Sequence, residues 1–184
     1  MQDVDDRVTT LLGRPHHYAY VTSDLDDAVE SFVWRLGAGP FFRNPPMALQ
    51  NVASPHGPAA FEHSSAFARH GDVAVELMEV HHAAPVQAER AFAPPHPRLH
   101  HVAWVLPSLE YGVRALEAAG FPLYLRAGFG EIAFTYHDAR AVLGHDLELH
   151  QDCAALRGFW APILAAGESW DGRDPVRAPG PPKG

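Results

Sequence analysis

The chain has 184 residues, of which 47% are hydrophobic and 20% are charged. These proportions are those of an ordinary globular protein that can bury one sizeable core or two small ones. The formal net charge of −8 argues against nucleic acid or an anionic membrane surface as a partner, because either would repel the chain. We therefore expect a small molecule as the partner.

The numbers of cysteines and histidines indicate where the protein is located and what kind of site it contains. Cys153 is the single cysteine, so no internal disulfide can form. The N-terminal stretch MQDVDDRVTTLLGRP carries acidic residues where a secretory signal would be basic and apolar, and no run of about eighteen apolar residues predicts a membrane span. We therefore expect a cytoplasmic protein. Thirteen histidines exceed what a core needs and direct attention to metal ligands.

The first half of the chain shows strand and helix periodicities in turn. In the first strand, His17, Ala19 and Val21 share one face. Ser23 or Asp24 can cap the helix that follows. The predicted elements are a strand (residues 17–21), a helix (25–36) ended by Gly37, a loop rich in Pro, Asn and Gly (44–58), and two strands (60–70 and 72–80).

The second half repeats this order 84 residues later. The stretches PHHYAYVTSDLDDAV (15–29) and LHHVAWVLPSLEYGV (99–113) both read His-His, then a β-rich run, then a leucine that opens a helical pattern. The repeat places His101 where His17 stands in the first half. The predicted elements are a strand (99–105), a helix (109–119) ended by Gly120, and three strands (121–127, 131–137 and 145–151).

The segments outside the repeat are expected to be less regular. Residues 81–98 contain four prolines and are predicted to be a linker between modules of about 14–82 and 98–152. We expect one domain over residues 1–152. Residues 153–184 are predicted to start as a helix and to finish as an irregular or disordered tail rich in Pro and Gly.

The repeat predicts how distant residues meet. Each βαβββ unit alone would leave a sheet face uncovered, so we expect the two units to pair around a pseudo-two-fold axis. Glu76 and Glu148 each lie inside an otherwise apolar last strand. A glutamate in a strand can simply face water, but two buried carboxylates require a cation or hydrogen bonds to compensate for their negative charge. A divalent metal bound by these carboxylates and by His17 and His101 would supply it.

These motifs resemble the vicinal oxygen chelate superfamily, which includes glyoxalase I, methylmalonyl-CoA epimerase, extradiol dioxygenases and bleomycin-resistance proteins. The resemblance spans roughly residues 14–152. It implies an α+β fold in which two tandem βαβββ modules form a curved, cup-like mixed sheet. It also implies one divalent metal ion (nickel, cobalt, zinc, manganese or iron) that chelates two adjacent substrate oxygens. The ligands that it implies are His17, Glu76, His101 and Glu148.

The ligand set favours redox-neutral chemistry. Extradiol dioxygenases use two His and one Glu, whereas glyoxalase and epimerase members resemble this chain in filling the Glu76 position. The resemblance therefore implies an isomerase, epimerase or glyoxalase-like lyase that forms an enolate or enediolate, with Glu148 or Glu76 as the base. An extradiol-type iron dioxygenase and a non-catalytic binder of a drug or metabolite are the alternatives.

Further residues are candidates for the substrate site. One residue earlier in each first strand, His16 and His100 should point away from the cavity, because side chains alternate along a strand. We find no arginines clearly suited to glutathione and no basic patch for a CoA phosphate. The resemblance is compatible with a homodimer, and Trp160 and Trp170 could cover the sheet, close the pocket or meet a partner. The candidates for substrate contact are His63, Arg43, Arg126, Tyr136 and His150, each of which could instead be a surface or core residue.

Overall fold

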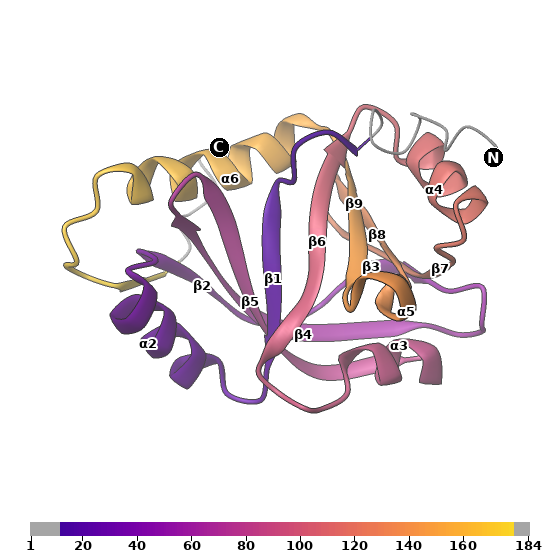
Figure 1. Cartoon of the computed structure of the whole chain (residues 1–184), viewed down its shortest axis with the longest axis horizontal. Coiled ribbons are helices and arrows are strands. Elements are labelled where there is room, and N and C mark those ends of the chain that lie inside the picture. Colours follow the sequence, from indigo (N-terminus) through magenta and orange to yellow (C-terminus); the bar gives the residue numbers. More distant parts are fainter. Residues whose placement is uncertain (1–11, 179–184) are drawn as a thin grey trace.

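The two halves of the chain meet where β1 (His17–Thr22) lies antiparallel to β6 (Arg98–Leu106). In the computed structural model, which describes residues 12–178, ten strands form one sheet in the order β10-β2-β4-β5-β1-β6-β9-β8-β7-β3. β1 pairs in parallel with β5, and β6 pairs in parallel with β9. The central four strands therefore repeat one arrangement in both halves (Figure 1). This is the mixed α+β architecture that the repeat predicts.

The remaining elements follow the predicted order with five additions, which are β2, β3, β10, α3 and α5. The other strands are β2 (Phe41–Ala48), β3 (Gln50–Ala53), β4 (Ala60–His70), β5 (Val73–Ala84), β7 (Leu123–Phe129), β8 (Ile132–His137), β9 (Asp146–Gln151) and β10 (Val176–Arg177). The helices are α2 (Leu25–Leu36), α3 (Val86–Phe92), α4 (Leu109–Ala118), α5 (Arg140–Leu143) and α6 (Ala154–Glu168).

Equivalent helices cover the outer face of each half of the sheet. Asp24 caps α2 by accepting from the backbone N–H of Asp27, and Gly37 ends it with a φ of 67°. Ser108 caps α4 in the same way. The apolar side of α2 packs on strands β4 and β5, and that of α4 packs on β6 and β9. Figure 1 shows the two helices on opposite flanks of the curved sheet.

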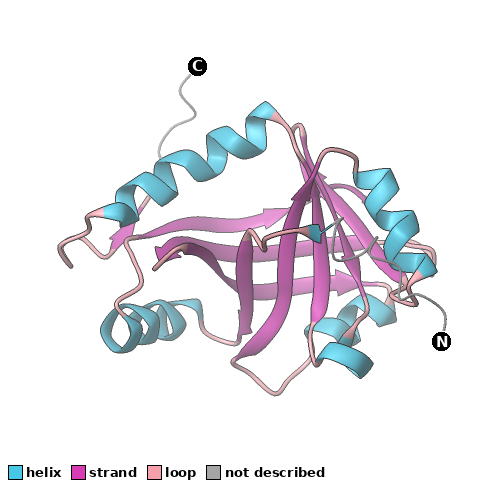
Figure 2. Cartoon of the chain, turned by 45° about the horizontal axis from the view of Figure 1, so that its top comes forward, coloured by secondary structure: helices cyan, strands magenta, loops and turns pink. Residues whose placement is uncertain are grey.

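The helices α6 and α3 pack on the inner face of the sheet. α6 runs across one end of the sheet (Figures 1 and 2) and buries Leu156, Trp160 and Ile163 against Phe67 of β4. α3 contributes Phe92 to a second cluster that includes residues of β1, β7 and β8. The inner face is therefore packed from two sides, and the strands between them carry the polar residues described below.

Two segments that were expected to be irregular contain regular structure. The linker prediction for residues 81–98 is wrong, because α3 forms there between the prolines and buries two alanines and Phe92. The loop prediction for residues 44–58 is also wrong in part. β2 extends to Ala48, with its two prolines inside a register shift where no ladder hydrogen bond is needed. β3 then crosses to pair with β7 of the other half.

The C-terminal segment returns to the sheet. α6 begins after Cys153, close to the predicted start, and β10 pairs in parallel with β2. The prediction of an irregular tail is therefore wrong for Val176 and Arg177, and its last part, residues 179–184, lies outside the described residues. Among residues 12–178, the helices are all too short or too polar to cross a bilayer.

Candidate metal centre

Four polar side chains point from the central strands to the inner face of the sheet. Each histidine lies opposite an alanine of the other half, and that alanine is paired with a glutamate in the next strand. Both alanines are fully buried, and their small side chains leave space between the polar ones. The two rows are His17, Ala103 and Glu148, and His101, Ala19 and Glu76.

The four polar groups form a compact, sealed cluster. Their ligand atoms all lie within 4.8 Å of one another. Glu148 Oε2 is 3.2 Å from His17 Nε2 and 3.1 Å from His101 Nε2. Glu76 Oε2 is 3.4 Å and 3.8 Å from the same two nitrogens. None of the four residues is more than 6% exposed, so both carboxylates are held away from bulk water.

The cluster fits a divalent metal ion. The Nε2 atoms of His17 and His101 are buried, and among the described residues they have no hydrogen-bond partner. This arrangement is costly unless a further group binds these atoms. Two donors about 2.1 Å from one ion lie about 3.0 Å apart at a right angle and about 3.4 Å apart at a tetrahedral angle. The observed separations of 3.1–3.8 Å are close to these values. Two imidazoles and two carboxylates suit zinc and its neighbouring first-row metals.

The cluster strongly perturbs its own ionisation. Burial lowers the pKa of His17, but the carboxylates of Glu148 and Glu76 beside its Nε2 outweigh this effect and raise that pKa to about 9. Burial raises the pKa of Glu148, but the charges of His150 and His101 outweigh it and hold that pKa well below its usual value. Without a metal, a proton on His17 therefore supplies part of the positive charge that the carboxylates require.

The alternation rule fails at His100. In the β1–β6 pair, Ala19 is opposite His101 and Tyr20 is opposite Leu99. His100 is therefore the extra residue of a β-bulge, which turns its side chain to the same face as His101. The prediction that His100 points away from the cavity is wrong for this reason, and the side chain is fully buried.

Both preceding histidines contact the ligand candidates directly. His100 Nδ1 lies 2.9 Å from His101 Nδ1, and His16 Nδ1 lies 3.0 Å from His17 Nδ1. The ring of His16 also packs edge-on against Trp160, with ring centroids 4.9 Å apart. The predicted orientation of His16 is therefore also wrong, because it precedes the start of β1 and strand alternation does not apply to it.

Three of the substrate candidates lie around the cluster. His150 Nε2 is 2.8 Å from Glu148 Oε2, and the Tyr136 ring centroid is 5.1 Å from that of His101. His63 is stacked on Phe61, and burial lowers its pKa. The Nδ1 atoms of His63 and His150 are buried without a hydrogen-bond partner, so each could still bind a further polar group.

The two candidate arginines lie elsewhere. Arg126 on β7 makes a two-pronged ion pair with Glu110 of α4, at 2.7 Å and 3.3 Å. Arg43 on β2 pairs with Asp26 of α2. The pairs occupy equivalent places in the two halves, and each fastens a helix to a strand. The structure does not bring either arginine into the cluster.

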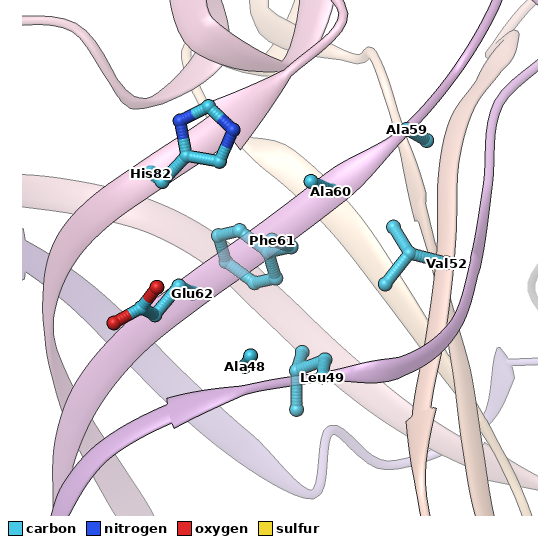
Figure 3. Close-up of a pocket in the computed structure, with 8 residues that line it drawn as sticks. All are labelled: Ala48, Leu49, Val52, Ala59, Ala60, Phe61, Glu62 and His82. Atoms are coloured by element: carbon cyan, nitrogen blue, oxygen red, sulfur yellow. The ribbon is translucent and has the colours of Figure 1, made fainter.

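The ring of Trp160 closes one side of the cluster. This α6 residue packs on His17 with ring centroids 5.0 Å apart and on Phe67 at 5.2 Å. On the other side lies a pocket of about 250 Å³ between β3, β4 and β5 (Figure 3). Phe61 lines this pocket, and its ring also packs on His63 and Tyr136. Phe61 thus separates the pocket from the inner residues.

Two paired βαβββ units with two histidines and two glutamates at the centre of their sheet are the features to compare with known protein families. Residues 16–136 match the model of the Glyoxalase/Bleomycin resistance protein/Dioxygenase superfamily, which is more than half of the chain. The chain therefore belongs to this superfamily, as its resemblance to the vicinal oxygen chelate proteins predicts. No curated protein gives a significant sequence match.

Solved structures are similar to this chain at low sequence identity. Methylmalonyl-CoA epimerase from Mycobacterium tuberculosis is 16% identical, with a TM-score of 0.50 over 79% of this chain and 92% of that chain. A Streptomyces coelicolor methylmalonyl-CoA epimerase variant in complex with 2-nitronate-propionyl-CoA is 16% identical, with a TM-score of 0.44 over 78% and 99%. A hypothetical protein from Bacillus halodurans is 14% identical, with a TM-score of 0.48 over 76% and 94%.

Some residues of the centre were not expected from the sequence. The repeated His-His pair could have indicated that His16 and His100 contact the ligand candidates, but strand alternation predicted that their side chains point away. Asp146 is fully buried 3.5 Å from His100 Nε2, and Tyr124 donates to it at 3.0 Å. Nothing in the local sequence distinguishes this buried aspartate from a solvent-exposed one.

Proposed function

We propose that this protein is a metal-dependent isomerase or epimerase that moves a proton on a small carbonyl compound. The observation that carries this proposal is the buried cluster of His17, Glu76, His101 and Glu148, which presents four ligand atoms within 4.8 Å. A divalent ion held there would act as a Lewis acid that polarises a carbonyl and stabilises the negative charge developing on its oxygen. A carboxylate beside it can then remove the neighbouring C–H proton.

The contacts of the two glutamates favour different roles. Glu148 Oε2 is within 3.2 Å of three imidazole nitrogens, those of His17, His101 and His150. Glu76 Oε2 has only two such contacts, at 3.4 Å and 3.8 Å. We assign Glu148 as the more firmly held ligand and Glu76 as the base. His63 and His150 would then bind substrate oxygens or exchange the abstracted proton through their free Nδ1 atoms.

The enclosure of the centre supports a small substrate. The four ligand side chains are almost completely buried, and Trp160 of α6 packs directly on His17. A CoA thioester would need a long open channel and cationic contacts for its phosphates, whereas Arg43 and Arg126 are engaged with Asp26 and Glu110. We therefore propose that the substrate is a small hydroxy or keto acid or a related carbonyl compound that fits beneath α6.

Proton exchange in D₂O tests this function. The metal-loaded protein is incubated with a panel of small α-hydroxy and α-keto acids and with an acyl-CoA. Loss of the NMR signal of the C–H protons next to a carbonyl group is then followed. We expect exchange with a member of the acid panel. Glu76→Gln should keep the metal and lose exchange, whereas Glu148→Gln should lose the metal.

The same preparation separates the alternatives. If the iron-loaded protein consumed oxygen in the presence of a catechol, the proposal would be wrong and the protein would be a dioxygenase. Saturable binding of a small molecule without exchange in any member of the panel would replace it by a binding protein. Exchange with the acyl-CoA alone would refute the proposed small substrate while leaving proton transfer in place.

A further inference from the structure

We propose that His16 and His100 are positioning residues that fix the tautomer and the orientation of His17 and His101, and that His100 is the stronger of the two because Asp146 supports it. This inference rests on the proposed metal centre, since it concerns how the chain presents two of the ligands. It assigns a role to the doubled histidines that open both halves of the sequence.

The argument begins with the two ring nitrogens of each ligand. His17 and His101 present Nε2 to the cluster, so a neutral ring that binds metal through Nε2 must carry its proton on Nδ1. The nearest partners for these protons are the Nδ1 atoms of the preceding histidines, at 3.0 Å and 2.9 Å. Each N–H therefore donates to a bare ring nitrogen, which holds the ligand ring at a fixed angle.

The acceptor histidines must then carry their own protons on Nε2. For His100 this proton points toward a buried carboxyl group, because its Nε2 lies 3.5 Å from Asp146 Oδ2. Asp146 is itself anchored by the hydroxyl of Tyr124 at 3.0 Å and lies 3.3 Å from Arg140 Nε. A series of polar contacts thus runs from the ligand His101 through His100 to the carboxyl group of Asp146.

Packing fixes the same ring independently. The ring of His100 is stacked on Phe92 of α3, with centroids 4.2 Å apart and planes at 9°. It also meets Tyr136 edge-on. In the first half, His16 is only half buried and packs on Trp160, and no carboxylate of residues 12–178 forms an ion pair with it. The chain therefore supports His101 more rigidly than His17.

Metal affinity measured by chelator competition with Zn²⁺ tests this assignment without any use of activity. His100→Leu removes the acceptor and keeps the bulk, and we expect it to weaken Zn²⁺ binding by about 10–100-fold. His100→Asn places a carbonyl oxygen where Nδ1 was and should recover most of that loss. His16→Leu should show a smaller loss, and His16→Asn should again recover it. His137→Leu is the matched control, because His137 is equally buried but bonds to Thr135 and to the carbonyl of Phe121.

A spectroscopic readout separates positioning from packing. In the Co²⁺-substituted protein, the Nδ1 protons of His17 and His101 should give two shifted NMR signals that exchange slowly with D₂O. His100→Leu should accelerate the exchange of one of them. Asp146→Asn tests the same contact if His100→Leu does not fold, and it should weaken Zn²⁺ binding in the same direction.

The outcomes distinguish this inference from the proposed function. The positioning role would be overturned if the Leu and Asn variants lost Zn²⁺ affinity equally. It would also be overturned if folded His100→Leu and His16→Leu bound Zn²⁺ within threefold of wild type. Either result would leave the proposed metal centre in place. A wild-type protein that binds no Zn²⁺ or Co²⁺ would overturn both. Losses in the Leu variants that the Asn variants recover would support the inference whatever the substrate.

Discussion

Removal of the metal should make the stability of this protein depend on pH above neutrality. In the metal-free protein, the neighbouring carboxylates of Glu148 and Glu76 raise the pKa of His17 from 6.5 to about 9. A raised pKa means that the folded state holds its proton more tightly than the unfolded state. The stabilisation is therefore fully present below pH 6.5 and is lost as the pH rises through 9.

The magnitude follows from the two pKa values. At about 1.4 kcal/mol per pH unit, the difference between 6.5 and about 9 corresponds to about 3 kcal/mol of unfolding free energy. Few other groups interfere in this window. Burial lowers the pKa of His63 and of His100, so both stay neutral. Burial raises the pKa of Asp146 from 3.8 to about 7, so this group loses its proton in the lower part of the window and adds a smaller loss of stability there.

Urea unfolding of the chelator-treated protein between pH 6.5 and 9.5 measures this loss. We expect the unfolding free energy to fall by about 3 kcal/mol through His17. His17→Gln should lack this part of the fall and keep only the smaller loss near pH 7 that Asp146 causes. The metal-loaded protein should not show the same slope, because its His17 is already neutral. A metal-free wild type with constant stability across this range, or an equal slope in His17→Gln, would refute the reasoning.

Three further substitutions test the packing by urea unfolding and metal content. Met78→Ala removes a fully buried side chain beside the centre and should cost about 2–5 kcal/mol; a cost below 1 kcal/mol would contradict the core assignment. Gly112→Ala places a Cβ 2.4 Å from Leu106 Cδ1 and should cost about 1–3 kcal/mol; an unchanged stability would contradict the close approach. Arg126→Ala removes a partly exposed ion pair and should cost under about 1 kcal/mol without loss of metal; a metal-free variant would place Arg126 at the centre after all.

The parts of the fold that repeat were predictable from the sequence. Two copies of the same strand-helix pattern 84 residues apart predicted that the two halves pair around a pseudo-two-fold axis. In the structure, β1 and β6 meet antiparallel, and this meeting brings His17 and His101 together. The glutamates followed because each lies in an otherwise apolar last strand. Local periodicity was sufficient for these elements, since both halves bury the same faces.

The features that were missed depend on contacts between distant segments. The bulge at His100 arises from the register of β1 against β6 and leaves no mark in the local pattern. The helix α3 lies between prolines and forms because Phe92 is buried in the inner cluster. The pairing of β3 with β7 joins the two halves and cannot be read from either stretch alone.

Metal content tests the central claim most directly. Untagged wild-type protein, His101→Ala and Glu148→Ala are compared by elemental analysis, with circular dichroism to confirm that each is folded. We predict close to one divalent ion per chain in the wild type and loss of that ion in both variants. A folded wild type that holds no nickel, cobalt, zinc, manganese or iron after incubation with each ion would contradict the account.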